Sequence, residues 1–331
     1  MTHPAARRLP FVFAMFVLMI AAIILAPLVG TTHISLAHAF DRSIPFADNV
    51  DAQIFFIARL PRALAAALVG GTLAAAGVIF QGLLRNPLAT PYTLGVSTGS
   101  ALGAMLAITF GASLPFVGIT SASLAGSMLA VLIVYFLARA RHAGLSTTVL
   151  LLAGVTLNAF FSALILFVEY LSDFAQTFRA IRWLMGNLDV VGYSSILGSL
   201  PFIVFAFAVF AWLARPLNLL SLGADAAATR GVNVTSVHRW AFFSASIATG
   251  AAVAVGGPIG FVGIIVPHLV RLVVGSDHRL VLPASAFLGA GFLVACDVLA
   301  RVILAPLELP VGVITAIIGG PFFLWMLVKK R

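Results

Sequence analysis

The sequence predicts an all-α polytopic membrane protein with ten transmembrane helices and both termini in the cytoplasm. Of the 331 residues, 62% are hydrophobic and only 9% are charged, whereas soluble domains carry about 25% charged residues. The apolar residues also fall into runs close to the ~20 residues that a helix needs to cross the hydrocarbon core of a bilayer. Because so few charges exclude a soluble globule, residues 1–331 are expected to form a single transmembrane domain.

The first apolar run covers residues 9–29 and follows Arg7 and Arg8. Downstream, the tripeptide Ala-His-Ala at 37–39 resembles a signal-peptidase site, so a cleaved signal is the alternative. The run is longer than the usual core of about 7–15 residues in a signal peptide, and the tripeptide lies well beyond its end. We therefore expect a retained span, followed by a polar outer loop over residues 31–53.

Nine further apolar runs follow, separated by polar or proline-containing turns. Pro87 and Pro91 mark one such turn, because proline prevents regular helix on both sides. Gly256-Gly-Pro258 marks another. The expected limits of these spans are residues 54–83, 93–110, 114–137, 147–170, 193–214, 240–255, 259–274, 280–304 and 310–328.

The distribution of basic residues sets the orientation. With the N-terminus inside, the inner loops and termini hold 13 of the 19 basic residues and two of the ten acids. This excess is the usual bias of cytoplasmic loops. It places the polar stretch 215–239 in the cytoplasm, and since no single patch collects the charge, nucleic acid is not an expected partner.

The stretch 215–239 is too polar and too interrupted to cross a bilayer. Its alanines, Ala224 and Ala226–Ala228, favour a short helix, and Gly223 and Gly231 bracket it. A short surface helix with small side chains is suited to contact a soluble partner. The alternative is an ordinary connecting loop.

Several classes of activity are excluded by single residue types. The only lysines are Lys329 and Lys330, and neither lies in a phosphate-binding loop, so any ATP hydrolysis is expected on another chain. Cys296 is the only cysteine, has apolar neighbours and is expected to be a buried thiol. The seven histidines lack ligand spacing, so no metal site is expected, and His268 and His278 are interpreted as structural hydrogen-bonding groups.

Two glycine-rich motifs have competing interpretations. Gly95-Val-Ser97-Thr-Gly99 matches the G-x-S-x-G pattern of serine hydrolases, but no strand pattern precedes it. Small residues at this spacing also let membrane helices approach closely, which is the favoured interpretation. Gly256 to Gly263 is interpreted as a broken or closely packed helix, a feature that can mark a transport path.

Arg59 and Arg62 are three residues apart and share a helix face at the outer surface. They are interpreted either as headgroup anchors or as contacts for an acidic partner, to which Arg301 would contribute. Asp297 precedes Arg301 by one turn, so an intramolecular pair is a competing use.

Arg179 and Arg182 share a face in the same way and lie near the expected outer mouth. They are candidates to receive an anionic substrate at its entrance. The alternative is that Asp173 and Asp189 neutralise them within the chain.

Five motifs in order resemble the FecCD family of permease subunits of bacterial ABC importers for ferric siderophores, haem and cobalamin. They are Arg59-Leu-Pro-Arg62, Arg85-Asn-Pro-Leu-Ala-Thr-Pro91, Leu94-Gly-Val-Ser-Thr-Gly99, Trp183-Leu-Met-Gly186, and Gly260-Phe-Val-Gly-Ile-Ile-Val-Pro-His-Leu-Val-Arg271 through Asp277-His-Arg279. The resemblance implies a homodimer in the bacterial inner membrane, with two cytoplasmic ATPase subunits that hold ATP and Mg²⁺ and a periplasmic binding protein outside. This chain itself would hold no cofactor. Length and composition resemble the haem-importing branch.

The resemblance also implies roles for particular residues. Arg59, Arg62 and Arg301 would dock the binding protein, and the fifth and tenth spans would line the path. Ser146, Thr147 and Thr148 would form the cytoplasmic gate. The ATPase-coupling segment would comprise Gly223, Ala224, Asp225, Ala226, Ala227, Ala228, Arg230 and Gly231, although the family commonly has an apolar residue in place of Arg230.

An importer of an iron chelate, with haem favoured over a ferric siderophore, is the preferred interpretation, and a cobalamin importer is the alternative. A secondary transporter or channel would instead carry acids or histidines at mid-depth in its spans. The expected boundaries place Glu169 and Asp297 near span ends, which favours the permease.

Overall fold

The computed structural model describes residues 8–87, 89–111, 118–140 and 147–329. Within these ranges every regular element is a helix. The long helices are α1 (Leu9–Leu25), α4 (Leu60–Leu84), α5 (Val96–Phe110), α6 (Ile119–Ala140), α7 (Thr147–Tyr170), α9 (Ser194–Leu220), α11 (Val234–Gly256), α12 (Val262–Val274), α13 (His278–Val302) and α14 (Val311–Lys329). Short elements are η2 (Ala26–Leu28), α2 (Leu36–Ala39), α3 (Val50–Gln53), η3 (Ile54–Arg59), η4 (Pro91–Leu94), α8 (Phe174–Leu184) and α10 (Ala224–Ala228).

These long helices occupy the positions of the expected spans. Six helical stretches are long and apolar enough to cross a membrane, and three shorter apolar ones lie at Val96–Phe110, Val262–Val274 and Val311–Trp325. An all-α membrane protein is therefore confirmed. The count of ten spans and the cytoplasmic placement of both termini stay predictions.

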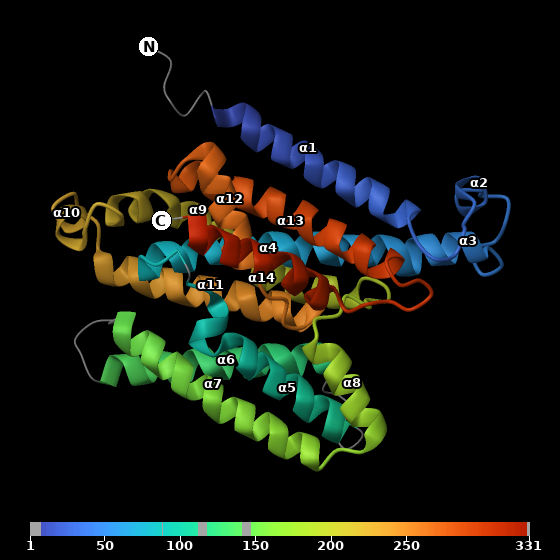
Figure 1. Cartoon of the computed structure of the whole chain (residues 1–331), viewed down its shortest axis with the longest axis horizontal. Coiled ribbons are helices and arrows are strands. Elements are labelled where there is room, and N and C mark those ends of the chain that lie inside the picture. The colour runs from blue at the N-terminus through green and yellow to red at the C-terminus, as the bar shows by residue number, and fades with distance from the viewer. Residues whose placement is uncertain (1–7, 88, 112–117, 141–146, 330–331) are drawn as a thin grey trace.

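The helices form two groups that lie side by side (Figure 1). In one group α4 is central and packs against α9, α11, α12 and α13, while α1 covers α13. In the other, α5 packs against α6, α7 and α8, and α11 contacts both α5 and α6 to join the groups. The lobe formed by α2 and α3 lies, like helix α8, at the end of the molecule opposite α10 (Figure 1).

Small residues allow the central contacts. A Cβ at Gly77 of α4 would lie 2.0 Å from the carbonyl oxygen of Gly263 in α12, and one at Gly70 would lie 2.3 Å from that of Gly289 in α13. In the second group, a Cβ at Gly99 would lie 2.6 Å from the Gly126 oxygen of α6. The close-packing interpretation of the Gly95–Gly99 motif is confirmed, since Ser97 lies buried within a helix rather than on an exposed turn.

Helix formation differs from the expected limits in two places. The segment around Arg215 and Pro216 continues α9 to Leu220, because Leu217 and Leu220 are buried and favour helix past the predicted end at 214. Helix α11 begins at Val234, before the predicted start at 240, since the Asn233 side chain caps it by accepting a hydrogen bond from the Ser236 amide at 2.9 Å.

The second span is longer than a bilayer requires. Helical structure runs without a gap over Val50–Leu84, 35 residues, or about 52 Å at ~1.5 Å per residue, against a hydrocarbon core of about 30 Å. The excess carries the lobe of α2 and α3 beyond the rest of the bundle (Figure 1).

Candidate functional site

Arg62, in the first turn of α4, is surrounded by three acids. Its Nε donates to Asp297 Oδ1 at 2.9 Å, and its Nη1 donates to Asp189 at 3.2 Å and to Glu308 at 2.6 Å. Only 12% of the Arg62 side chain is exposed. The arginine therefore joins α4 to α13 and to the segments that follow α8 and α13.

Arg59 and Arg301 are not free at the surface. Arg59 donates to the carbonyl oxygens of Pro27, at 3.1 Å, and Thr32, and it is buried. Arg301 pairs with Asp297 Oδ2 at 3.1 Å with 5% of its side chain exposed, so the competing intramolecular pair is confirmed. Both guanidinium groups hold the chain between α1 and α4 in place and are therefore not exposed, and a docking role for Arg59 and Arg301 stays a prediction. A docking role for Arg62 stays a prediction.

The two arginines of α8 have different surroundings. Arg182 Nη2 donates to Asp189 Oδ2 at 2.5 Å, so Asp189 neutralises it. Asp173 instead caps α8, accepting from the Gln176 amide at 2.7 Å. Arg179 is exposed, and no ion pair joins it to an acid in the described ranges. The predicted neutralisation thus holds for Arg182 through Asp189, and substrate contact by either arginine remains a prediction.

The glycine-rich break between α11 and α12 is a true helix discontinuity. Phe261 adopts a left-handed conformation with φ of 68°, and the Tyr92 hydroxyl donates to the Ile259 carbonyl at 2.5 Å. Asn158 of α7 in turn donates to the Tyr92 carbonyl at 3.0 Å, which ties the break to α7. A pocket of about 220 Å³ lies here, lined by Leu73, Thr90, Tyr92, Gly260, Phe261, Gly263 and Ile264.

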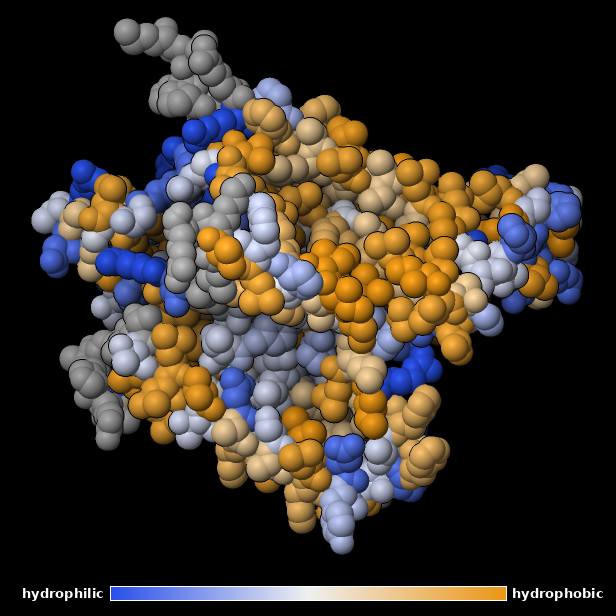
Figure 2. Space-filling view, viewed as in Figure 1, coloured by the Kyte–Doolittle hydropathy of each residue, from blue (hydrophilic) through white to orange (hydrophobic). Residues whose placement is uncertain are grey.

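The space-filling view shows a hollow between the layer that holds α14 and the layer that holds α7 (Figure 2). Residues of intermediate hydropathy colour its floor, and its rim carries both apolar and hydrophilic ones. A path between the fifth and tenth spans, which α7 and α14 would line, stays a prediction.

At the opposite end, α10 stands out from the bundle (Figure 1). Gly223 and Gly231 bracket it with φ of 122° and 82°, conformations that other residues rarely adopt, so the predicted short helix is confirmed. Ala228 and Asp225 are exposed, but Ala227 is completely buried. The coupling role of the segment, Ala227 included, stays a prediction.

The other side chains singled out in the sequence are a histidine, the three residues of the predicted gate and the cysteine. His278 Nδ1 lies 2.7 Å from Asn218 Oδ1, which confirms its structural interpretation. Ser146 of the predicted gate lies outside the described residues, Thr147 begins α7, and Thr148 is exposed in its first turn.

Cys296 is buried with 1% exposure, as expected. In the part of the chain that the structure describes, no three His, Cys, Asp or Glu side chains are grouped to hold a metal ion.

The model of the FecCD transport family matches residues 18–329. The chain belongs to the FecCD transport family. The Hemin transport system permease protein HmuU of Yersinia pestis is 41% identical over 283 residues, which cover 84% of this chain and 84% of that protein. The Cobalamin import system permease protein BtuC of Halobacterium salinarum is 42% identical over 298 residues, covering 90% and 79%. The Fe(3+) dicitrate transport system permease protein FecD of Escherichia coli is 41% identical over 275 residues, covering 82% and 84%.

A solved structure agrees with this assignment. A putative metal-chelate type ABC transporter in an inward-facing conformation is 33% identical, with a TM-score of 0.84, and covers 97% of this chain and 99% of that one. This FecCD protein is accordingly a membrane permease subunit of an ABC importer.

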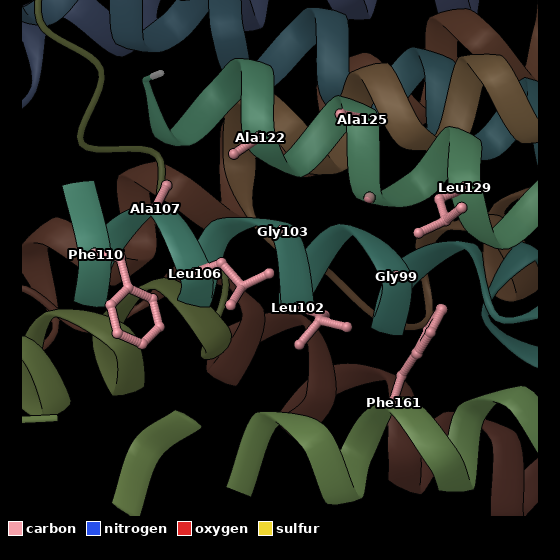
Figure 3. A pocket seen from close by; sticks show the side chains of 11 residues that line it. Gly99, Leu102, Gly103, Leu106, Ala107, Phe110, Ala122, Ala125, Leu129 and Phe161 are labelled. Carbon is pink, nitrogen blue, oxygen red and sulfur yellow. The ribbon is translucent and has the colours of Figure 1, made fainter. Parts of the chain in front are cut away.

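This FecCD chain also has a larger groove, of about 510 Å³, between α5, α6 and α7 (Figure 3). Leu102 and Leu106 of α5, Leu129 of α6 and Phe161 of α7 are among its lining residues, all of which are apolar or glycine. No lining group can recognise a charge, so the groove is no candidate for binding an anionic chelate.

Sequence reasoning missed two contributors to the outer site of this FecCD chain. Glu308 was not connected with Arg62, 246 residues away, because no spacing rule joins such distant positions. The limits of α8 were not predicted, although the shared face of Arg179 and Arg182 presupposed helix there and the capping-box spacing of Asp173 and Gln176 was a readable signal for its start.

Proposed function

We propose that this FecCD permease moves a metal chelate inward across the bacterial inner membrane, driven by ATP hydrolysis on separate subunits. Haem, a ferric siderophore and cobalamin are the candidate cargoes, since relatives of nearly equal identity are named for haem, ferric dicitrate and cobalamin. The observation that carries the proposal is the family match over residues 18–329, nearly the whole chain.

The proposed assembly contains two copies of this chain, two ATPase subunits that bind ATP and Mg²⁺, and one soluble periplasmic binding protein. Exposed apolar side chains on α7 and α14 support a second copy on this side, among them Leu166, at 66% exposure, and Ile317, at 62%. The exposed residues of α10 would meet the ATPase subunits. Arg62, at the opposite end, would lie under the binding protein.

The test is uptake into proteoliposomes that contain the permease, its ATPase subunit and its binding protein, with radiolabelled haem, ferric siderophore and cobalamin offered separately. We expect ATP-dependent uptake of one cargo class. Liposomes without the ATPase subunit are the control and should show none. Uptake that proceeds without the ATPase, or that follows an ion gradient, would instead identify a secondary transporter.

A further inference from the structure

Two acids lie over Arg62 at the outer surface. The Asp189 and Glu308 side chains are 39% and 37% exposed, whereas that of Arg62 is 12% exposed. Both acids accept hydrogen bonds from the same atom, Arg62 Nη1. A soluble protein that approaches from outside therefore meets the acids before it meets the arginine.

The third acid has a different position. Asp297 is 1% exposed and accepts from Arg62 Nε at 2.9 Å, while Arg301 lies on its other side at 3.1 Å. This buried contact holds the Nε edge of the Arg62 guanidinium in place. The partners of Nη1, in contrast, are the two partly exposed acids, so these are the contacts that another acid can replace.

Asp189 has a second arginine available. Its Oδ2 accepts from Arg182 at 2.5 Å and from the Asn187 side-chain amide at 2.6 Å, while its Oδ1 faces Arg62 at 3.2 Å. The contact with Arg62 is the longest of the three. If Arg62 were taken by another acid, Asp189 would still be paired.

The backbone around Asp189 is anchored, so the exchange involves the side chain. The Gly312 amide donates to the Gly186 carbonyl at 3.2 Å, and the Gly192 amide donates to that of Ile57 at 2.9 Å. Leu188 and Val190, on either side of Asp189, are buried. Only the carboxylate of this segment stands at the surface between the two arginines.

We propose that Asp189 is an intramolecular competitor, which occupies Arg62 until an acidic side chain of the soluble binding protein replaces it and which then remains on Arg182. The inference rests on the proposed function, from which it takes the soluble partner. It adds that docking is an exchange of acids on Arg62, so that Asp189 sets the docking affinity. Glu308 competes in the same way but has no second arginine among its described contacts.

The direction of one mutational effect separates this role from a purely structural one. If the pair of Asp189 and Arg62 only supports the docking surface, its loss weakens docking or leaves it unchanged. If Asp189 competes, its loss tightens docking. Exposed ion pairs contribute little, so the expected change is roughly two- to fivefold in Kd.

The experiment measures binding of the purified, substrate-free binding protein to the permease complex in nanodiscs. Asp189→Asn keeps the size and polarity of the side chain and should lower Kd by roughly two- to fivefold. Glu308→Gln is a second variant with the same expected sign. Asp173→Asn is the matched control: it removes one negative charge at the far end of α8, retains a capping side chain and should leave Kd unchanged.

Arg182→Gln should act in the opposite direction, because Arg62 is then the only arginine among the described residues that contacts Asp189. The double variant Asp189→Asn, Arg182→Gln should bind like Asp189→Asn if Arg182 acts through Asp189. The inference is overturned if the unsubstituted complex docks the binding protein normally but Asp189→Asn and Glu308→Gln both dock it no more tightly. The proposed function would still stand in that case. Absence of docking by the parent complex overturns the partner in the proposed function and the inference with it.

Discussion

Arg301 is a buried residue in the last turn of α13. It pairs with Asp297 at 3.1 Å and donates to the Val29 carbonyl at 2.8 Å. We expect Arg301→Gln to lower the free energy of unfolding by about 3 kcal/mol, the lower end for a broken buried pair, because Arg62 still contacts Asp297. Unfolding in detergent micelles measures this, with Arg42→Gln in the exposed outer loop as control. Equal stability of the two variants would contradict it.

Asp277 gives a pH dependence outside the spans. Hydrogen bonds from Arg279 and Asn218 hold the pKa of its carboxyl at about 2, below the ordinary 3.8. Because the folded pKa is the lower one, the carboxylate stabilises the fold above pH 3.8, and this contribution is lost as pH falls towards 2. The Tm difference between the parent and Asp277→Asn should shrink over that interval. A constant difference would contradict the assignment.

Residue spacing correctly placed Arg59 and Arg62 at one end of the same helix, but it could not predict which groups contact their side chains. Arg59 and Arg62 do lie at the outer end of one helix, yet Arg59 is enclosed by carbonyl groups 27 and 32 residues away along the chain. Backbone acceptors carry no sequence signature. The pair of Asp297 and Arg301 was foreseen because its partners are four residues apart.

At the scale of elements, two substitutions in α10 distinguish an effect on ATPase coupling from an effect on folding. Ala228→Glu places a charge on an exposed position and should abolish ATPase binding or uptake while leaving Tm unchanged. Ala227→Glu buries the charge and should unfold the local structure, because a buried unpaired carboxylate is strongly disfavoured. Co-purification with the ATPase subunit and Tm together check both variants. Intact binding and uptake by Ala228→Glu would remove α10 from the coupling site.

The contact between α4 and α12 gives a packing prediction. A Cβ at Gly77 would lie 2.0 Å from Gly263 O, whereas one at Gly198 in α9 has nothing within 4 Å. Gly77→Ala should cost about 1–3 kcal/mol because the helices must separate. Gly198→Ala is the matched control and should be neutral or slightly stabilising. Thermal unfolding of the two variants in one detergent compares them, and equal Tm values would contradict the packing argument.

Hydropathy predicted the long helices well because membrane spans must be both apolar and helical. The predicted fifth span matches α7, Thr147–Tyr170, to the residue. The limits of α8 were not predicted, because its polar face breaks the apolar run. Helix α9 was cut short at Arg215, since charge suggested a loop where buried Leu217 and Leu220 continue the helix.

At the scale of the whole molecule, α8 would surround the proposed entrance with arginines from two copies. Asp189 already neutralises Arg182 at 2.5 Å, whereas Arg179 is exposed. We therefore expect Arg179→Ala to slow the uptake of an anionic chelate by roughly threefold or more, through loss of electrostatic attraction, and Arg182→Ala to have a smaller effect.

Initial uptake rates in proteoliposomes at low salt check this difference, with Arg42→Ala as control. Assembly and docking of the binding protein should stay unchanged in the Arg179 variant. Normal uptake by the double variant Arg179→Ala, Arg182→Ala would exclude both residues from substrate entry.

The burial of Cys296 has a practical consequence for spectroscopy. The sequence contains one cysteine, and 1% of it is exposed. A maleimide dye or spin label should therefore react with an introduced cysteine at an exposed position outside the proposed coupling segment, such as Arg42→Cys, and leave the native thiol unmodified. If the protein assembles with two copies, as proposed, the distance between the two labels then becomes measurable through the turnover cycle without first replacing the native cysteine of this chain.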